Sequence, residues 1–350
     1  MASLIPQVHK LIYGNWATSV TYTFAELGIA DCFNGERRFV DYLAEQTGTA
    51  TEMLERFLRC AANLDLIETD HDDGYVLSPL GDLLRSDHPQ SQRAAARLNG
   101  APYRYHPWGQ LTDILKQGPS SKYADTAASG TLDYLADKPE LKAVFHQAMT
   151  DLSVRDDQVL SKSFPFDQFK HIIDVGGGHG SFLTAILESA GNSKGTLFDR
   201  KDTFEQLRSS DTAYKPVQAL ETSGKLRLIG GDFFDSVPTD GDLYIIKNTI
   251  HNWPQHQTKK LLKSLSEAMR HNQTSESANA DKRLLIIEYL VADEAGSEMA
   301  NWLDLNFMIL VNGKSRTQKE YTDIAADAGL ELAGVHPTKI GRKILEFKLA

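Results

Sequence analysis

Polar residues suited to ligand binding and proton transfer follow successive apolar runs in the second half of the chain. Asp174 precedes a glycine-rich run at 176–180, and other residues end or follow later apolar runs, namely Asp199, Asp232, His251 and Glu288. Glycine lets a backbone approach a ligand closely, and carboxylates accept hydrogen bonds from hydroxyl and amino groups. Histidine exchanges a proton near neutral pH. Together these residues predict ligand binding combined with acid–base chemistry.

The glycine-rich run differs in spacing from a common alternative. Gly176, Gly178 and Gly180 form the pattern G-x-G-x-G, whereas dinucleotide-binding loops have G-x-G-x-x-G. Ser181 stands where the third glycine of that pattern belongs. The run therefore predicts a ligand-binding turn other than the dinucleotide type, and a glycine turn without a ligand is the alternative.

The next two acidic positions suit the two halves of a nucleoside. Asp199 lies twenty-five residues after Asp174, where its carboxylate can accept hydrogen bonds from two ribose hydroxyls. Asp232 offers an acceptor for an adenine amino group, beside the aromatic face of Phe233. Taken singly, each of these residues is equally typical of a solvated loop.

The elements that must position these residues form an α/β pattern. Short β-rich runs occupy 171–175, 196–198, 226–229, 243–246, 284–287, 332–336 and 344–347, and helical stretches such as 257–269 separate them. Alternating strands and helices predict a doubly wound parallel sheet covered on both faces. Ligands bind beyond the carboxyl ends of such strands, where the polar residues fall. The last two runs predict an antiparallel hairpin at one end of the sheet.

The first hundred residues predict a mainly helical domain that resembles a winged helix. A helix at 17–33 closes at Gly28, and Thr49 with Glu52 forms a capping box that opens a second helix at 54–64. Short strands at 66–67 and 75–77 flank a turn at Asp73.

Charge decides between two uses of that pattern. Residues 41–87 contain eleven Asp or Glu, three Arg and no Lys, a field that repels DNA. A structural or dimerising role is therefore favoured, and a DNA-binding regulator is the alternative that salt-dependent DNA affinity would support.

The middle of the chain reads as helical. One segment begins at Pro107 and Trp108, and Pro139 opens a helix that carries Phe145 and Met149 along one side. We predict an N-terminal domain at 1–100, a helical connector at 101–165 that contributes to a substrate pocket, and an α/β domain at 166–350.

Composition excludes several other classes of protein. The chain has 350 residues, a net charge of −10 and two cysteines. It contains no apolar run of the ~20 residues that cross a bilayer, no signal-peptide pattern and no ligand-spaced metal cluster. We expect a cytoplasmic protein without a metal, a membrane partner or a nucleic-acid partner, and a surface loop at 272–281.

The ordered set of motifs resembles a known family. The motifs lie at 176–180, 197–199, 231–233, 247–253 and 313–317, and they are similar to those of small-molecule O-methyltransferases of plant caffeate type and their microbial relatives that tailor polyketides and phenazines. The resemblance implies a Rossmann-like class I methyltransferase domain, a winged-helix dimerisation domain and a homodimer. It implies S-adenosylmethionine as cofactor and S-adenosylhomocysteine as product. The implied cofactor-binding residues are Asp174, Gly176, Gly178, Asp199, Asp232, Phe233 and Lys247.

The reaction that the resemblance implies needs alignment and a base. The sulfonium already activates the methyl group, whereas a phenol with a pKa of ~10 is mostly protonated at neutral pH. His251 is the candidate base, and Glu288 would orient its imidazole. The implied substrate wall suits a planar, mostly apolar aromatic or polyketide-like molecule, and it comprises Phe145, Met149, Asn252, Trp302, Asn306 and Phe307.

Two positions depart from the family pattern. Ser315 replaces a second glutamate beside the histidine, and Asn252 replaces an aspartate. Both changes remove negative charge from around His251. One explanation is an O-methyltransferase with an acidic phenol as substrate. The other is different chemistry on the same scaffold, namely hydroxylation, decarboxylation, a pericyclic rearrangement, or methyl transfer to carbon or nitrogen.

Overall fold

The computed structural model describes residues 4–69, 74–118, 134–135, 137–209, 211–271, 282–291 and 298–350. The chain forms two compact units, one of residues 1–110 and 135–152 and the other of residues 111–134 and 153–350. The turn predicted at Asp73 and the loop predicted at 272–281 lie outside the described residues. The predicted domain divisions at residues 100 and 165 stay predictions.

The first unit is mainly helical, with one two-stranded hairpin. Its elements are α1 (Ile5–Ile12), α2 (Gly14–Glu26), η1 (Ile29–Cys32), α3 (Val40–Thr47), α4 (Thr51–Asn63), β1 (Ile67–Thr69), β2 (Tyr75–Leu77), α5 (Pro79–Asp82), α6 (Arg93–Gly100), α7 (Pro102–Trp108) and the first part of α11 (Pro139–Leu160). Phe24, Phe33 and Leu58 pack in its core. The predicted order of helices followed by an antiparallel β1–β2 hairpin is confirmed.

Two local predictions in this unit are wrong. The capping box at Thr49 and Glu52 does not form, because α4 begins one residue later with Ala50 at its N-cap, and the Thr49 hydroxyl pairs with that of Thr47 instead. Pro107 does not begin a segment, since it lies inside α7 near its end. Proline is tolerated there because a helix of seven residues has few backbone bonds for it to remove.

The second unit is built around a seven-stranded sheet in the order β5-β4-β3-β6-β7-β9-β8. Its elements are α8 (Leu111–Gln117), η2 (Phe166–Gln168), β3 (His171–Val175), α12 (Ser181–Ser189), β4 (Lys194–Asp199), α13 (Lys201–Ser209), α14 (Asp211–Thr222), β5 (Leu226–Gly230), β6 (Leu243–Lys247), η3 (Ile250–Asn252), α15 (Gln255–Arg270), β7 (Arg283–Glu288), α16 (Glu298–Val311), α17 (Gln318–Asp327), β8 (Leu330–Pro337) and β9 (Lys343–Leu349). The five strands from β5 to β7 are parallel, and β9 and β8 add antiparallel at one edge. Each predicted strand of this half is confirmed.

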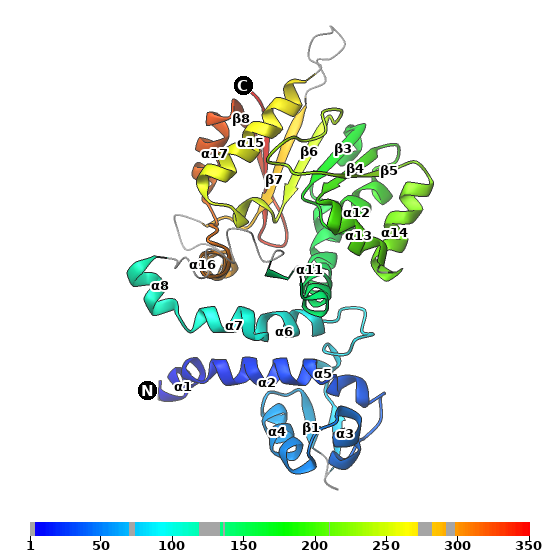
Figure 1. The fold of residues 1–350 in the computed structure, drawn as a ribbon, viewed down its shortest axis with the longest axis vertical. Coiled ribbons are helices and arrows are strands. Elements are labelled where there is room, and N and C mark those ends of the chain that lie inside the picture. Colours follow the sequence, from blue (N-terminus) through cyan, green and yellow to red (C-terminus); the bar gives the residue numbers. More distant parts are fainter. Residues whose placement is uncertain are drawn as a thin grey trace. The chain divides into compact units, whose positions relative to one another are not determined.

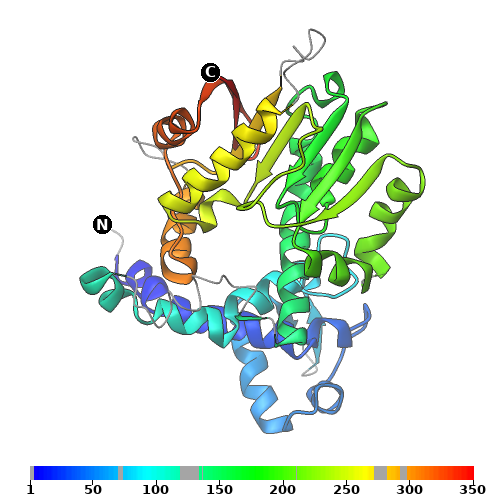
Figure 2. The ribbon, with the colours of Figure 1, turned by 45° about the horizontal axis from the view of Figure 1, so that its top comes forward.

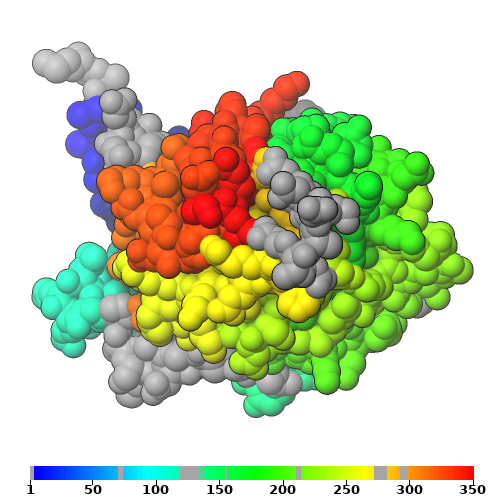
Figure 3. Space-filling view, turned by 90° about the horizontal axis from the view of Figure 1, so that it is seen from above, coloured from blue at the N-terminus to red at the C-terminus, as the bar shows by residue number. Residues whose placement is uncertain are grey.

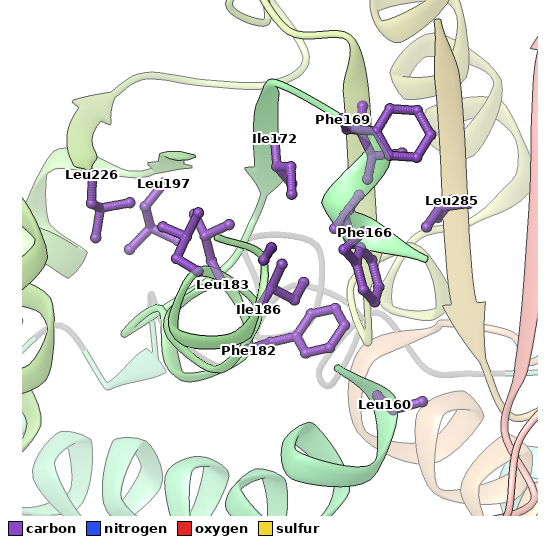
Figure 4. Packing of buried hydrophobic residues seen from close by; sticks show 14 of the residues in the cluster. Leu160, Phe166, Phe169, Ile172, Phe182, Leu183, Ile186, Leu197, Leu226 and Leu285 are labelled. Carbon is purple, nitrogen blue, oxygen red and sulfur yellow. The ribbon is translucent and has the colours of Figure 1, made fainter. Parts of the chain in front are cut away.

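Alternation along the strands divides the core into two layers. On β6, Leu243 and Ile245 pack with α12, α13 and α14, whereas Tyr244 and Ile246 pack with α15 and α17. Figure 1 and Figure 2 show the two groups of helices on opposite sides of the strands. Figure 4 shows the first layer, in which Phe182 and Ile186 of α12 meet Phe166. Because both faces are covered, the buried positions of the central strands are mostly apolar, as is typical of a parallel sheet, and Asp174 on β3 is an exception.

The edge of the sheet is closed by the C-terminal hairpin. Figure 3 shows the C-terminal strands, in red, beside orange residues of the α16–α17 region and yellow residues of α15. Phe347 of β9 and Ile324 of α17 belong to the same buried cluster. The chain runs from β3 outward to β4 and β5, then returns to β6 on the other side of β3. This reversal places the switch point of the sheet, where such folds bind ligands, at the carboxyl ends of β3 and β6.

Candidate active site

The glycine loop follows β3 at the switch point, and its glycines differ in how much space surrounds them. Gly176, Gly178 and Gly180 all have positive φ, at 71°, 59° and 79°. A Cβ on Gly176 would lie 2.9 Å from Cγ2 of Thr249, which is closer than van der Waals contact allows. A Cβ on Gly178 would have no described atom within 4 Å. Gly176 is thus fixed by packing against the loop after β6, while the loop is open at Gly178.

Asp199, at the end of β4, is tied to this loop. Its Oδ2 accepts a hydrogen bond from the Gly178 amide at 2.8 Å, and its Oδ1 accepts from the Arg200 amide at 2.7 Å and from the Thr203 hydroxyl at 2.9 Å. Burial raises the pKa of Asp199 above its ordinary value, and the two amide hydrogen bonds oppose that rise. The carboxylate is therefore held at a fixed place beside Gly178.

Asp174 is a buried carboxylate without a hydrogen bond. It is 1% exposed, and neither Oδ1 nor Oδ2 finds a partner among the described residues. Burial raises its pKa to about 7, and the nearby charge of Lys247 acts in the opposite direction. Buried polar groups are normally paired, so this group needs an explanation that a cationic ligand would supply.

Sequence reasoning missed Asp157, which the fold brings to the same place. Its Oδ1 lies 2.7 Å from Nζ of Lys247, and its Oδ2 accepts from the Ser181 hydroxyl at 2.6 Å. Asp157 is 1% exposed and lies one helical turn before the fully buried Leu160 on α11. Its spacing of one helical turn from Leu160 is compatible with burial, but the sequence indicates neither Lys247 nor Ser181 as its partner. The ammonium group of Lys247 is thus already paired with the Asp157 carboxylate.

The two residues predicted at the adenine position follow β5. Asp232 is exposed, and its Oδ1 accepts a hydrogen bond from the Phe234 amide at 2.8 Å. Phe233 is half-buried, with its ring 6.0 Å from that of Trp253 in an edge-on arrangement. Asp232 and Phe233 therefore lie on a loop braced by aromatic contacts.

His251 lies on η3, just beyond β6, and is held from two sides. Its Nδ1 lies 2.8 Å from Oε2 of Glu288, the last residue of β7. The ring of Phe307 stacks on the imidazole at 3.9 Å between centroids and 11° between planes. If Nδ1 carries the proton that Glu288 accepts, Nε2 has the free lone pair of a base. His251 and Glu288 are both buried, at 9% and 3% exposed.

Two positions depart from the family pattern: Asn252 follows His251 along the chain, and Ser315 follows Lys314, whose amide donates to the His251 carbonyl at 2.9 Å. Ser315 is buried, and its amide donates to Oδ1 of Asp304 on α16 at 2.8 Å. Asn252 follows His251 on η3 and is half-buried. Among the described residues, the carboxylate of Glu288 and the ring of Phe307 contact the His251 imidazole.

The predicted substrate wall is divided between the two units. Phe145 and Met149 belong to the first unit, where Phe145 packs against a helical cluster that includes Leu98. Trp302 and Asn306 lie on α16 of the second unit, and Trp302 is 55% exposed. Because these residues belong to two units that are described separately, the substrate wall stays a prediction.

Membrane and metal features were sought in the described parts of the chain. No helix there is both long and apolar enough to cross a bilayer. No group of three His, Cys, Asp or Glu side chains with the geometry of a metal site occurs there.

Comparison with known proteins identifies the family. A model of the O-methyltransferase domain matches residues 108–331, and a model of the O-methyltransferase dimerisation domain matches residues 9–87. The chain belongs to the O-methyltransferase family. It is an S-adenosylmethionine-dependent enzyme of the kind found in secondary-metabolite pathways. The predicted family, fold class and cofactor are thereby confirmed.

Several relatives of this O-methyltransferase match along nearly their whole length. The phenazine O-methyltransferase PhzM of Lysobacter antibioticus is 30% identical over 97% of this chain and 94% of its own. The mitomycin biosynthesis 6-O-methyltransferase of Streptomyces lavendulae is 27% identical over 98% of this chain and 94% of its own. The 8-amino-8-demethylriboflavin N,N-dimethyltransferase of Streptomyces davaonensis is 30% identical over 91% of this chain and 88% of its own.

Solved structures agree with these matches. The crystal structure of LaPhzM superimposes with a TM-score of 0.88 and 28% identity over 100% of both chains. The structure of the mitomycin 7-O-methyltransferase MmcR gives a TM-score of 0.86 and 26% identity over 100% of this chain and 98% of that one.

The residues at the switch point fit the cofactor of this family. S-adenosylmethionine carries a sulfonium and an ammonium, and the unpartnered carboxylate of Asp174 is suited to a cationic neighbour. The open space at Gly178, beside the fixed carboxylate of Asp199, leaves room for a ligand next to the loop.

Proposed function

We propose that this O-methyltransferase methylates a hydroxyl group of a small aromatic or polyketide-like metabolite, with His251 as general base. The observation that carries the proposal is the contact of 2.8 Å between Nδ1 of His251 and Oε2 of Glu288 at the carboxyl edge of the sheet. A neutral imidazole oriented in this way keeps Nε2 free to accept a phenolic proton.

The residues have separate tasks in the reaction. The cofactor supplies an electrophilic methyl group when it is bound. His251 takes the proton from the substrate hydroxyl, and Glu288 stabilises the imidazolium that results, since its carboxylate faces Nδ1. Phe307 keeps the imidazole plane fixed through stacking at 3.9 Å. Restricting the base in this way favours alignment, which is worth ~7–11 kcal/mol in well-oriented reactions.

We assign cofactor binding to the residues at the ends of β3, β4, β5 and β6. Asp199 would accept hydrogen bonds from the ribose hydroxyls, and Asp232 with Phe233 would bind the adenine. The remainder of the cofactor would contact the glycine loop and its buried polar neighbours, Asp174, Gly176, Gly178 and Lys247. The fixed carboxylate of Asp199 and the unpartnered carboxylate of Asp174 support this assignment.

The substrate class follows from the wall residues and from two relatives. Phe145, Met149, Asn252, Trp302, Asn306 and Phe307 form a mixed aromatic and polar set that suits a planar ring system. One relative is named as a phenazine O-methyltransferase, and another as a 6-O-methyltransferase of mitomycin biosynthesis. We therefore propose a fused-ring phenol as the acceptor.

Methyl transfer to an aromatic amine is the second candidate. Ser315 leaves one carboxylate beside His251, and a relative 30% identical is named as an N,N-dimethyltransferase. An amine attacks through its own lone pair and depends less on a base than a phenol does.

A matched substrate pair separates the two candidates. Purified enzyme is incubated with S-adenosylmethionine and either a hydroxy- or an amino-substituted phenazine, and S-adenosylhomocysteine and the methylated product are quantified by mass spectrometry. We expect turnover of the hydroxy compound that depends on His251. Turnover of the amine alone would replace O-methylation with N-methylation, and product without S-adenosylhomocysteine would indicate non-methylating chemistry.

We propose that the enzyme works as a homodimer. Residues 9–87 match the family's dimerisation model, and α1 with its N-cap residue presents apolar side chains of which none is buried, including Leu4, Ile5, Leu11 and Ile12. Leu11 is 83% exposed. Exposed apolar patches of this kind mark protein interfaces, and a second copy is the occupant that the family model favours. Light scattering should show a dimer, and Leu11→Asp should shift it toward monomer; a monomeric wild type would remove this proposal.

A further inference from the structure

In the turn that carries His251, the Trp253 amide donates to the Ile250 carbonyl at 3.3 Å, whereas the carbonyls of His251 and Trp253 receive no hydrogen bond from the described backbone of the turn itself. Helix C-termini always leave such carbonyls, and buried ones need partners from elsewhere. Three carbonyls of this turn, those of Ile250, His251 and Trp253, accept hydrogen bonds from one distant segment at 314–316, and the Trp253 carbonyl also accepts from the Thr258 hydroxyl at 3.3 Å. We call residues 313–316 the support segment.

Arg316 spans the two ends of the turn. Its Nη2 donates to the Trp253 carbonyl at 2.9 Å, and its Nη1 donates to the Ile250 carbonyl at 3.5 Å and to the Lys314 carbonyl at 3.0 Å. The residue is 2% exposed. A guanidinium holds its donors in one rigid plane, so it fixes the separation of the acceptors that it bridges.

The centre of the turn is held by the backbone of the same segment. The Lys314 amide donates to the His251 carbonyl at 2.9 Å. A Cβ on Gly313 would lie 2.2 Å from that carbonyl oxygen, so only glycine lets the two backbones come this close. The support segment therefore contacts the turn before, at and after His251.

The support segment is itself anchored to two helices. The Ser315 amide donates to Asp304 of α16 at 2.8 Å, and a capping box between Thr317 and Glu320 begins α17. The Gly313 amide donates to the carbonyl of Phe307 at 3.1 Å. Because Phe307 stacks on the imidazole, the segment is bonded both to the backbone under His251 and to the residue that covers its ring.

We propose that Arg316 is a positioning residue that holds His251 in register with Glu288 and with the substrate hydroxyl. This inference rests on the proposed role of His251 as general base. Arg316 acts through the backbone of the turn and not on the substrate. Its removal should therefore cost activity only while His251 is present to be positioned.

A double-mutant cycle tests this. The rate constant kcat and the affinity for S-adenosylhomocysteine are measured for wild type, Arg316→Met, His251→Ala and the double variant. Misplacing a catalytic group by an ångström costs up to about 10²-fold, so we expect Arg316→Met to lower kcat by about 10- to 100-fold without changing affinity for S-adenosylhomocysteine. In the His251→Ala background the same change should alter kcat by less than about twofold, because residues that act as one unit are not additive.

Two further variants guard against a general loss of structure. Arg283→Met removes a half-buried arginine far from His251, one that pairs with Glu346 at 2.9 Å and begins β7 at the opposite end from Glu288. It should lose comparable thermal stability with kcat unchanged. Gly313→Ala disturbs the same turn independently, and it replaces Arg316→Met in the double-mutant cycle if Arg316→Met does not fold. Arg316→Lys keeps the positive charge but has one nitrogen in place of the two that bridge the carbonyls, so its kcat should lie between those of Arg316→Met and wild type.

The outcomes separate this inference from the proposed function. If Arg316→Met, or Gly313→Ala in its place, lowers kcat equally with and without His251, Arg316 is merely structural and the inference is overturned. If His251→Ala alone keeps the wild-type rate, the proposed base is wrong, and that result is read from the single variant before the cycle is considered.

Discussion

The glycine loop and the His251 turn lie at the same edge of one sheet, yet they treat their polar groups in opposite ways. At the loop, the Asp174 carboxylate is buried and has no hydrogen bond to any described residue, and no described atom occupies the space beside Gly178. At the turn, three backbone carbonyls are bonded to the support segment, and the His251 ring is held by Glu288 and Phe307.

The difference teaches how this enzyme divides binding from chemistry. A cofactor that brings its own charges can satisfy groups that the free protein leaves unpaired. A base must already be in place when the substrate arrives, so the chain supplies its partners from β7, α16 and the support segment. Changes at the loop should therefore alter binding, and changes at the turn should alter turnover.

The largest effect should follow His251→Ala. Loss of a general base lowers kcat by about 10²- to 10⁴-fold, and steady-state turnover with a hydroxyphenazine would measure it. His256→Ala, an exposed histidine on the first turn of α15, is the matched control and should leave kcat unchanged. Equal kcat values for His251→Ala and wild type would show that the His251 turn does not supply the general base.

Asp199→Ala should come next and act on binding. The carboxylate accepts hydrogen bonds from Gly178, Arg200 and Thr203, and its loss frees the loop as well as removing the ribose acceptor. Hydrogen bonds to charged groups are worth about 1.5–3 kcal/mol, which predicts about 10- to 100-fold weaker binding of S-adenosylhomocysteine. Asp202→Ala, three residues along the same segment, should bind normally; equal losses in both variants would contradict a specific role.

Asp174 should make stability depend on pH. Its folded pKa of about 7 exceeds the ordinary value of ~3.9, so between these values the folded protein keeps a proton that the unfolded chain has lost. The stabilisation is complete below pH ~4 and is lost as pH rises through 7. In urea unfolding, wild type should lose at least about 1 kcal/mol relative to Asp174→Asn between pH 5 and pH 8. Asp232→Asn changes an exposed carboxylate, so its free energy of unfolding should follow that of wild type across this pH range. If the difference in free energy of unfolding between wild type and Asp174→Asn is the same at pH 5 and pH 8, the pKa of Asp174 is not raised in the folded protein.

The smallest effect should follow Phe307→Leu. Aromatic pairs contribute about 0.5–1.5 kcal/mol beyond burial, so removing the ring that stacks on His251 should lower kcat by about two- to tenfold. Phe307→Tyr preserves the stack and should retain the rate. If the effect is confined to KM and Phe307→Tyr does not restore it, Phe307 contacts only the substrate and does not steady the base.

The sheet was predictable from sequence because its strands alternate between two buried layers. Leu243 to Ile246, for instance, are all apolar because successive side chains enter opposite cores, and such a run is hard to mistake for a loop. The cofactor loop was predictable for a similar reason, since positive φ at Gly176 and Gly178 demands glycine. Polar residues at the strand ends then followed from topology.

Tertiary pairing was not predictable in the same way. Asp157 was missed because nothing local to α11 indicates that Lys247 and Ser181 will reach it. The capping box was assigned to Thr49, whereas the box that forms joins Thr317 to Glu320, because both sequences carry the same local signal. The bridging contacts of Arg316 also could not be read from sequence, since its partners are backbone carbonyls.

Calorimetric titration with S-adenosylhomocysteine tests the division between binding and chemistry most directly. Wild type, Asp199→Ala and His251→Ala are titrated under one set of conditions. The account predicts that His251→Ala binds as wild type does, within about twofold, while Asp199→Ala binds about 10- to 100-fold more weakly. Equal weakening in both variants, or normal binding by Asp199→Ala, would contradict it.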